Sequence, residues 1–469
     1  MLQLRLRGRH TGAAVTGAVA CLALLGAAGD EVTLQPRAGD PLPGLDVALL
    51  ERFAAGRIAF NSPLAQADGL GPVFNDNSCR NCHNQPVTGG FSTRTVTRFG
   101  KAATGGSPFD PLGSLGGSLL QEQAISASCE ESVPAEADVV VERGTPALFG
   151  IGLVEAIDDA VLLDRAANQP PGLSGVAHMV TPLEGGPQRV GRFGWKGDIA
   201  TVLTFSGDAA MMELGLSNDL IPFDNAPNGD LATLAACDSV ADPEDVPDSE
   251  GFRMIDRFTD YQRLLAAPPQ TPRSGMTGET LFASVGCADC HVPTVYEATT
   301  SLEPSINGRS FKPYSDFLLH DMGTLGDGVV SGSASEQLMM TRPLWGMKGR
   351  IALLHDSAST GGTFRDIVLD CIDRHDGEAA ASRAAYQALS VAEQDLVVTF
   401  LDSLGQVEFD FEGDNDVDFI DWFFIEPQVT GPGTSFTPDD QQALSDVDQD
   451  GDIDLIDFGY LQRAFTGEL

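Results

Sequence analysis

The stretch Cys79-Arg80-Asn81-Cys82-His83 has the pattern C-x-x-C-H, and Cys287-Ala288-Asp289-Cys290-His291 is a second copy. Two thiols at this spacing can form thioether bonds with the vinyl groups of a haem, and the histidine that follows can bind the iron. A thioredoxin-like C-x-x-C would be expected in a βαβ setting, and a zinc site sharing four thiols would leave both histidines unexplained. The two copies therefore predict two covalently bound c-type haems.

The segments before the two motifs predict helices. From Leu45 to Phe60, apolar residues recur at spacings of three to four, which is one face of a helix. A similar segment, Gly278-Glu279-Thr280-Leu281-Phe282, precedes Cys287. A helix that carries an aromatic residue toward a haem, followed by C-x-x-C-H, is typical of the start of a c-type cytochrome domain. We therefore expect a mainly α fold with two cytochrome c-like haem domains.

A proline-rich segment without periodicity, residues 266–272, predicts the junction between the two haem domains. The expected domains are an N-terminal one over residues 30–265 and a C-terminal one over residues 274–405. The second domain ends in a predicted helix that starts with the capping box Ser390-x-x-Glu393. Its apolar stripe is best interpreted as core, and it consists of Leu396, Val397, Phe400, Leu401 and Leu404.

Length, charge and the N-terminal segment limit the class of protein. The chain has 469 residues, of which 42% are hydrophobic, which is enough for two or three domains with cores. The net charge of -39 argues against nucleic acid or an anionic membrane surface as a partner. Residues 1–29 are typical of a signal peptide, with three arginines before an apolar run that is too short to span a membrane. We expect an exported protein without a transmembrane segment, periplasmic or extracellular.

The cysteines outside the two motifs suggest one disulfide. Cys21 is interpreted as part of the leader rather than as a lipidated cysteine. An oxidising compartment permits Cys129 to pair with Cys237, although the sequence alone does not fix the connectivity. Cys371 would then be left as a buried, inert thiol.

The C-terminal segment, residues 406–469, is strongly acidic, with 17 acidic side chains and one basic side chain, Arg463. Its carboxylates fall at positions 1, 3, 5, 9 and 12 of two calcium-loop patterns. Gly451 occupies the sixth position of the second loop, and Asn415, which also tolerates left-handed backbone angles, occupies that of the first. The predicted calcium ligands are Asp410, Glu412, Asp414, Asp418, Asp421, Asp446, Asp448, Asp450, Asp454 and Asp457.

Each acidic loop is followed by an aromatic-rich segment that could form a short helix. The last ligand position holds Asp rather than Glu, so the segment resembles a pair of dockerin loops more than a helix-loop-helix sensor. This resemblance implies a dockerin-like domain over residues 406–469 that binds calcium. It also implies a cohesin-like partner, or a terminal domain held together by calcium.

Several motifs of the haem region occur in the order found in one family. They are Gly71-Pro72-Val73-Phe74-Asn75, Gly89-Gly90-Phe91-Ser92, the stretch from Tyr314 to Gly323, and Arg342-Pro343-Leu344-Trp345-Gly346. Over residues 38–405 the chain resembles the di-haem oxidoreductase family of peroxidase-like proteins, relatives of the di-haem cytochrome c peroxidases. The resemblance implies two facing haem domains, one with a closed iron and one with an open sixth position.

The resemblance implies His375 as the distal ligand of the second haem. This residue ends the helical segment 363–374, where the relatives carry Met, Tyr or His, although a four-residue insertion lies there. Met322 and His355 are the next candidates. His320 and His355 occur in motifs of the relatives and are interpreted as supporting or packing residues, and His178 as an ordinary histidine.

For the first haem, the classical relatives place a distal histidine near the segment Thr97-Arg98-Phe99, which contains none, so this iron is expected to be open. Arg98 could donate to bound peroxide, or bind haem propionates. Trp195 resembles the tryptophan that relays electrons between the haems, with an ordinary buried indole as the alternative. Phe205 replaces an expected glutamine. Glu213 lies near the position of a catalytic glutamate and is the predicted acid-base group, unless it is surface charge.

Together these features predict an exported di-haem oxidoreductase that is peroxidase-like. It would take electrons from a donor protein at the second haem and reduce a small oxidant such as peroxide at the first. The alternative is a pure electron-transfer cytochrome in which both irons have six ligands.

Overall fold

A helix that ends near the motif histidine precedes each C-x-x-C-H motif. The computed structural model describes residues 34–105, 107–240, 246–269, 276–300, 302–436 and 440–466. In it α1 (Val47–Asn61) precedes the first motif and α8 (Thr277–Ser284) the second, which confirms both expected helices. The ring of Phe60 lies 6.0 Å from that of His83, and the ring of Phe282 lies 6.4 Å from that of His291. The predicted leader, and residues 270–275 at the predicted junction, lie outside the described residues.

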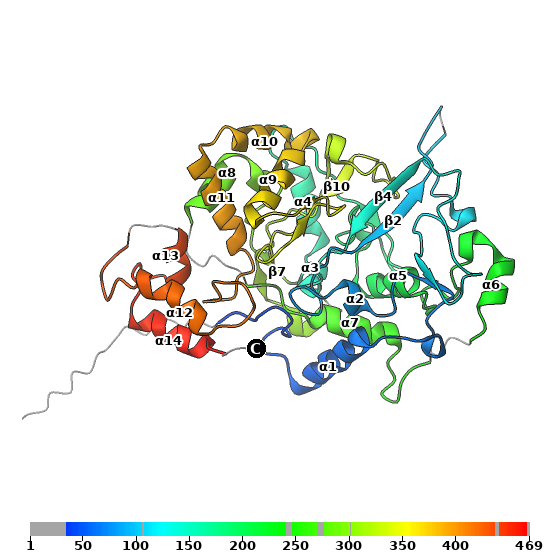
Figure 1. The fold of residues 1–469 in the computed structure, drawn as a ribbon, viewed down its shortest axis with the longest axis horizontal. Helices are drawn as coiled ribbons and strands as arrows, with labels where there is room; N and C mark the ends of the chain where they lie inside the picture. The colour runs from blue at the N-terminus through cyan, green and yellow to red at the C-terminus, as the bar shows by residue number, and fades with distance from the viewer. Residues whose placement is uncertain are drawn as a thin grey trace, which may run out of the picture. The chain divides into compact units, whose positions relative to one another are not determined.

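The remaining elements are short (Figure 1). The other helices are α2 (Cys79–Cys82), α3 (Ile151–Glu155), α4 (Asp159–Ala167), α5 (Val202–Leu214), α6 (Leu231–Cys237), α7 (Met254–Leu264), α9 (Phe364–Arg374), α10 (Ala380–Gln387), α11 (Val391–Ser403), α12 (Phe419–Ile425), α13 (Asp440–Ser445) and α14 (Leu455–Ala464). The strands are β1 (Val73–Phe74), β2 (Thr95–Gly100), β3 (Gln123–Ala124), β4 (Val139–Gly144), β5 (Met179–Val180), β6 (Arg189–Val190), β7 (Tyr296–Glu297), β8 (Ser310–Phe311), β9 (Leu319–Asp321), β10 (Leu338–Met340), β11 (Ala352–Leu353) and β12 (Ser359–Thr360). Within the described residues, no helix combines the length and the apolar character needed to cross a membrane.

The expectation of a mainly α, cytochrome-like fold is wrong. The structure is 36% helix and 12% strand, and its strands form several two-stranded antiparallel sheets. The longest ladder pairs β2 with β4, from Thr95 opposite Gly144 to Gly100 opposite Val139 (Figure 1). Helical periodicity was the pattern used for the prediction, and it does not detect β-branched runs such as Val139-Val140-Val141. The chain also has 52 glycines and 28 prolines, which favour the turns and loops that separate short hairpins.

Helix α1 packs closely against α7 beside the first motif. The side chain of Asp46 caps α1 by accepting a hydrogen bond from the backbone N–H of Leu49. The helix then buries Leu49, Phe53, Gly56 and Phe60. A Cβ atom added at Gly56 would lie 2.4 Å from the carbonyl oxygen of Arg257, so only glycine permits this approach. The close contact holds the first motif against the core.

Two hydrophobic clusters surround the two motifs. The first includes Phe60, Phe74 and Tyr261, and Cys79 packs against it. The second includes Phe282, Tyr386 and Phe400, and Cys287 packs against it. Helix α11 supplies Val397, Phe400 and Leu401 to the second cluster and starts at the predicted capping box of Ser390 and Glu393. The first cluster also contains Tyr296, Phe311 and Trp345, so the C-terminal half of the chain contributes to both.

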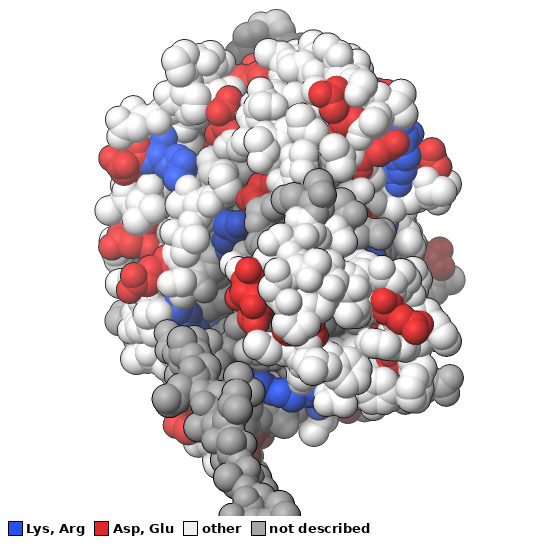
Figure 2. Space-filling model, turned by 90° about the vertical axis from the view of Figure 1, so that its left-hand side faces the viewer, with Lys and Arg blue, Asp and Glu red and all other residues white. Residues whose placement is uncertain are grey.

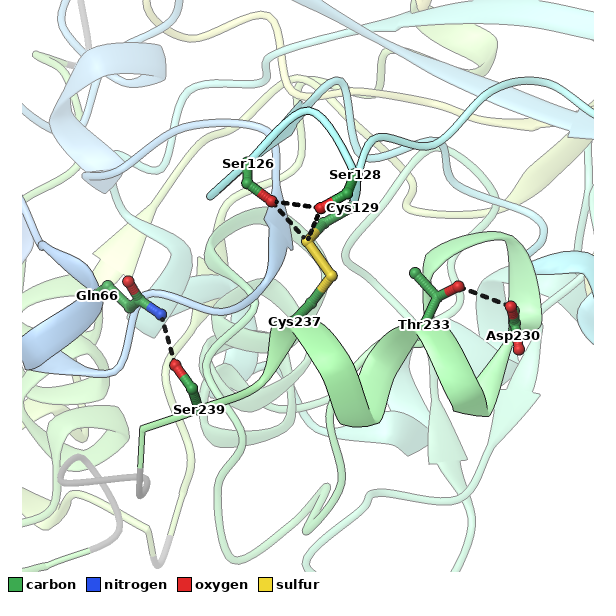
Figure 3. The surroundings of a disulfide bond; sticks show 8 residues. All are labelled: Gln66, Ser126, Ser128, Cys129, Asp230, Thr233, Cys237 and Ser239. Carbon is green, nitrogen blue, oxygen red and sulfur yellow. Dashed lines mark hydrogen bonds between the residues drawn. A yellow bond between two sulfur atoms is a disulfide. The ribbon is translucent and has the colours of Figure 1, made fainter.

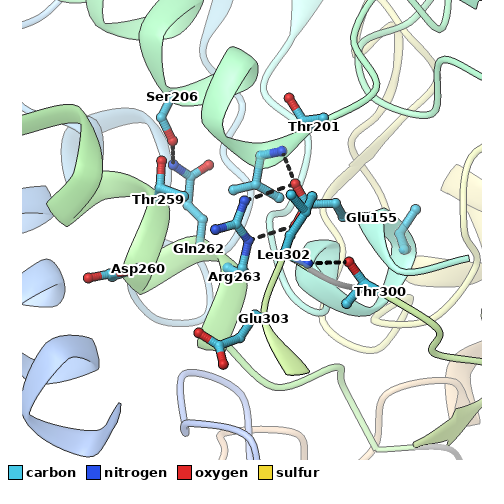
Figure 4. A network of polar contacts seen from close by, with 12 residues as sticks. Glu155, Thr201, Ser206, Thr259, Asp260, Gln262, Arg263, Thr300, Leu302 and Glu303 are labelled. Carbon is cyan, nitrogen blue, oxygen red and sulfur yellow. Dashed lines mark hydrogen bonds and ion pairs between the residues drawn. The ribbon is translucent and has the colours of Figure 1, made fainter. Parts of the chain in front are cut away.

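A buried ion pair joins three elements near the first motif (Figure 4). Arg263 in α7 donates through Nε to Glu155 Oε2 at 2.7 Å and through Nη2 to Oε1 at 3.0 Å. The backbone N–H of Val202, the first residue of α5, also donates to Glu155 Oε1, at 2.7 Å. Glu155 is fully buried, and these bonds compensate for its desolvation. The network thereby fixes the start of α5, the helix that carries Glu213.

A disulfide joins Cys129 to Cys237, which confirms the pairing that the sequence left open (Figure 3). Cys237 ends α6, and the Oγ of Ser126 lies 3.0 Å from the sulfur of Cys129. Asp230 begins α6 by accepting a hydrogen bond from the N–H of Ala232. The disulfide therefore links the loop after β3 to the segment between α5 and α7.

The acidic C-terminal segment contains two similar loop-and-helix units. Helix α12 starts at Asp418 and α14 at Asp454, and each of these carboxylates accepts a hydrogen bond from the N–H two residues on. The third helical residue, Asp421 or Asp457, accepts a bond from the backbone N–H of its cap in return. The expected short helices after the acidic loops are therefore present.

Candidate functional site

The second motif lines a cavity of about 260 Å³. A short 3-10 turn, Cys287–Asp289, follows Gly286, whose φ of 88° ends α8. His291 donates its Nδ1–H to the carbonyl oxygen of Tyr314 at 3.1 Å, so Nε2 is left to bind a metal. Burial lowers the pKa of His291 to about 4, which keeps the ring neutral at pH 7.

His375 lies on the same cavity as His291. It caps the C-terminus of α9, and its Nδ1 donates to the carbonyl oxygen of Cys371 at 2.8 Å. Burial lowers the pKa of His375 as well. Two neutral imidazoles with free Nε2 atoms and the two thiols of Cys287 and Cys290 are the donor set of a six-coordinate c-type haem, so these residues fit the group.

The other candidate ligands are also placed by the structure. Met322 and His355 line the same cavity, so both remain alternatives to His375. His320 has both ring nitrogens engaged: Nε2 lies 2.9 Å from Asp316 Oδ2, and Nδ1 lies 2.7 Å from Glu378 Oε2. Burial alone would lower the pKa of His320, but hydrogen bonding to Asp316 and Cys290 and the charge of Asp316 raise it to about 11. Because both ring nitrogens of His320 form hydrogen bonds and its ring is protonated, His320 is a supporting residue rather than an iron ligand.

The first motif is held in the same way as the second. Helix α2 carries both cysteines, and His83 donates its Nδ1–H to the carbonyl oxygen of Gly90 at 3.1 Å. Burial lowers the pKa of His83 to about 4, so its Nε2 is also free and unprotonated. Cys79, Cys82 and His83 therefore fit a covalently bound haem with one protein ligand on this side of the iron.

Glu213 is partly exposed and lies beside the first motif. Its Oε2 accepts a hydrogen bond from Asn75 Nδ2 at 2.7 Å, and its backbone carbonyl accepts one from the N–H of Asn75 at 2.8 Å. Burial raises the pKa of Glu213. Its charge acts on the thiols of both Cys79 and Cys82, which places the carboxyl group close to the first haem site.

Arg98 faces the same region from β2. Its Nη1 donates to Ser118 Oγ at 3.2 Å, while its Nε is buried without a hydrogen-bond partner. Burial lowers the pKa of Arg98, and the charges of Glu213 and Asp208 oppose this. Asp208 was not predicted from the sequence. It lies in α5, burial raises its pKa, and a search for acidic residues five positions from Glu213 would have found it.

Trp195 lines the cavity of the second motif on the side toward the first. Its Nε1–H donates to the carbonyl oxygen of Gly144 at 3.1 Å, and its ring centre lies 6.3 Å from that of His355. Pro146 lines the same cavity and also contacts His83 through its backbone. The indole hydrogen-bonds to Gly144, two residues before Pro146 in the chain. Phe205, at the position of the expected glutamine, packs against Phe193 with ring centres 6.1 Å apart.

The acidic loops bring part of their predicted ligands together. One group consists of Glu412, Asp418 and Asp421, and its ligand oxygens lie within 4.8 Å of one another. Asp410 and Asp414 are used differently: Asp410 accepts from the N–H groups of Gly413 and Asn415, at 2.6 and 2.9 Å. Asp414 accepts from the N–H of Asp416 at 3.0 Å.

The second loop gathers Asp446, Asp448 and Asp457 within the same limit of 4.8 Å. Of the other predicted ligands, Asp450 accepts from the N–H of Asp452, and Asp454 caps α14. Gly451 has a φ of 89° and Asn415 a φ of 74°, which confirms the left-handed turn expected at both sixth positions.

The donor sets at the two motifs fit two haems, one at each motif. A family model described as "Di-haem oxidoreductase, putative peroxidase" matches residues 121–404, and the chain belongs to this family. The name implies two haem cofactors and an oxidoreductase. The match is narrower than the resemblance over 38–405: it covers the second motif, Trp195, Glu213 and His375, but not the first motif or the acidic segment. No curated protein matches the chain.

Proposed function

We propose that the chain is an exported enzyme that reduces peroxide, or a similar small oxidant, beside His83 with electrons received at the second haem. One observation carries the proposal: the two sites differ in what faces the motif. The second motif has a second imidazole, His375, in its cavity. The first has a carboxyl group, Glu213, and a guanidinium, Arg98, whose charges act on each other. An acid and a hydrogen-bond donor suit a site where an oxidant binds and protons move.

The chain's own residues could divide the work as follows. Haem, when bound, supplies the electron chemistry at both sites. At the first site, Glu213 would take the proton of one peroxide oxygen and give it to the other. The two electrons that break the O–O bond would come through the haems, and two protons from solvent would complete two water molecules. The raised pKa of Glu213 brings it nearer to neutral pH, where a group can both take and give a proton. Arg98 donates to the oxidant, and Trp195 provides a route for electrons between the sites.

The alternative is an electron carrier in which both irons have six ligands. Visible and EPR spectra of the oxidised holoprotein distinguish the two functions. We expect a high-spin component that changes when cyanide is added, together with steady peroxide reduction when a donor is supplied. An entirely low-spin spectrum without a cyanide response, together with no peroxide turnover, would establish the carrier instead.

We also infer that residues 406–469 bind calcium and attach the enzyme to a cohesin-like partner. Asp446 supports the calcium site: it is only 3% exposed, and its Oδ1 has no hydrogen-bond partner although it lies in an acidic cluster. A cation would supply the missing partner. Apolar side chains on the two helices remain exposed, including Phe419 at 72%, Phe423 at 68% and Leu455 at 78%.

A pull-down with a cohesin domain tests the attachment. The protein should be retained with calcium and released by a chelator, and Asp446→Asn should weaken retention. Asp395→Asn, outside this segment, is the control and should behave as the parent. Retention that is equal with and without calcium would contradict the proposal.

Export rests on the predicted leader and on the disulfide, which forms in oxidising compartments. N-terminal sequencing of the secreted or periplasmic protein should give a start at Asp30. An unprocessed N-terminus on a functional cytoplasmic protein would contradict export.

A further inference from the structure

Two partly exposed arginines on the cavity of the second motif lack the acidic partner that several other arginines of the chain have. Arg342 and Arg350 both line this cavity. Arg342 donates through Nη1 to the carbonyl oxygen of Gly194 at 3.1 Å, and Arg350 through Nε to that of Gly346 at 3.3 Å. In the described part of the chain, neither guanidinium forms an ion pair. Each has only a carbonyl to bind.

Three other arginines of the same protein do have acidic partners. Arg143 binds Asp327 at 2.6 Å, Arg263 binds Glu155 at 2.7 Å, and Arg192 pairs with Asp159. Burial lowers the pKa of both Arg342 and Arg350 to about 10, and no carboxylate opposes it. For Arg342 the charge of Arg350 is a further cause, so the two cations also repel each other. Two like charges on the wall of one cavity repel each other, and a bound anion would remove this repulsion.

Aromatic rings fix where the two guanidinium groups lie. The Arg342 guanidinium carbon is 5.1 Å from the centre of the Trp195 ring, and that of Arg350 is 4.7 Å from the centre of the Phe91 ring. Cation–π contacts hold the charges in place but do not neutralise them. Phe91 follows Gly90, whose carbonyl holds His83. The arginine pair therefore lies where the cavity approaches the first motif.

We propose that Arg342 and Arg350 bind the propionate carboxylates of the haem attached at Cys287 and Cys290. Propionates are the only charged groups of a haem, and guanidinium binds carboxylate through two parallel hydrogen bonds. The thiols and both arginines line one cavity, so one ligand can reach all four. The inference rests on haem at the second motif, which the family name implies, and not on peroxide chemistry.

Redox titration of the holoprotein tests the proposal. In the parent, ionised propionates should keep the midpoint potential of the low-spin haem nearly constant between pH 6 and 8. In Arg342→Leu and Arg350→Leu, loss of a positive charge should favour the ferric form at pH 8. We expect at least a tenfold change in the one-electron equilibrium constant, which corresponds to about 59 mV. The potential should then rise as the pH falls, because the released propionate takes up a proton.

The control is Arg309→Leu. Arg309 also binds a backbone carbonyl, that of Pro43 at 2.7 Å, but it does not line the cavity. Its loss should leave the potential and its pH profile unchanged. If the two leucine variants keep the low-spin spectrum and titrate like this control, the proposal is wrong. Because titration requires no peroxide, this outcome is distinct from a failure of the peroxidase function.

Two further measurements are useful. The first uses milder variants in case the leucine variants lose haem, and the second tests whether a soluble anion, rather than a propionate, binds the arginine pair. Arg342→Lys and Arg350→Lys keep the charge but not the planar fork. They should keep the parent potential and shift the propionate bending bands in resonance Raman spectra. Unchanged bands in both lysine variants would contradict the proposal. So would a parent potential that responds to exchange of chloride for sulfate at fixed ionic strength, since a soluble anion would then occupy the pair.

Discussion

Glu213 is the side chain that most directly separates an enzyme from an electron carrier. Replacing it with glutamine keeps the shape and removes the proton shuttle, so peroxide should bind but react more slowly. Acid-base groups contribute about 100- to 10,000-fold to such rates, and stopped-flow mixing of the holoprotein with peroxide measures the effect. Glu136→Gln, an exposed change, serves as the control. Equal rates in Glu213→Gln and the parent would mean that another group moves the proton.

His375 offers a spectroscopic test at the same scale. His375→Ala should make the second haem high-spin while both haems remain covalently attached, because thioether bonds do not depend on the distal ligand. Added imidazole should restore the low-spin spectrum by filling the vacated position. If the low-spin signal remains in this variant without imidazole, the distal ligand is another residue, with Met322 and His355, which line the same cavity, as the next candidates.

The two acidic loops predict how the C-terminal segment responds to pH without calcium. Burial raises the pKa of both Asp410 and Asp457 to about 6. Because an unfolded aspartate has a pKa of about 4, the folded segment binds more protons between about pH 4 and 6. Its free energy of unfolding should therefore decrease as the pH rises through this window.

Calcium should reverse this loss. When the free calcium concentration is one hundred times the dissociation constant of a site, binding at that site adds about 2.7 kcal/mol to the free energy of unfolding. Calorimetry of the holoprotein in chelator and in calcium, at pH 5 and pH 7, measures both effects. Haem should remain attached throughout. If melting at pH 7 is the same with calcium as with chelator, the loops bind no calcium.

The disulfide predicts a large effect on stability. It joins residues separated by 108 positions, and constraining an unfolded loop of that length is worth roughly 5 kcal/mol on the chain-entropy model. Denaturant unfolding with and without reductant should show this loss. The double variant Cys129→Ser/Cys237→Ser should start from the lower stability and not respond to reductant. A variant as stable as the oxidised parent would contradict the prediction.

The net charge of the whole molecule predicts the kind of electron donor it accepts. At -39, the chain attracts basic proteins over long distances. Acidic and basic side chains are interspersed on the face shown in Figure 2, so the attraction depends on the summed charge rather than on one patch there. Reduction by a small basic cytochrome should therefore slow steeply as salt is added, whereas reduction by an acidic donor should become faster because salt screens the repulsion. Rates that are independent of salt for both donors would contradict this.

The sequence was sufficient for features set by short-range pattern. The two C-x-x-C-H motifs, helix α1 and the capping box of α11 depend on spacings within a few residues, and the structure contains them. Most of the strands are only two or three residues long, too short to show a period of two in the sequence. The longest ladder also pairs segments far apart in the chain, as Thr95 and Gly144 are. The arginine pair was missed for a different reason. What distinguishes Arg342 and Arg350 is the lack of a nearby carboxylate, which only the folded chain reveals.

The hydrogen bonds of His83 and His291 have a consequence for the irons that they would bind. Both rings donate Nδ1–H to a backbone carbonyl, at 3.1 Å in each case. A neutral carbonyl draws the proton away less than a carboxylate does, so neither ring gains imidazolate character. The two proximal imidazoles therefore give their irons nearly equal electron push. If both haems are bound, a difference in their electron affinity would come from other groups, such as His375 and the arginine pair near one motif and Glu213 and Arg98 near the other.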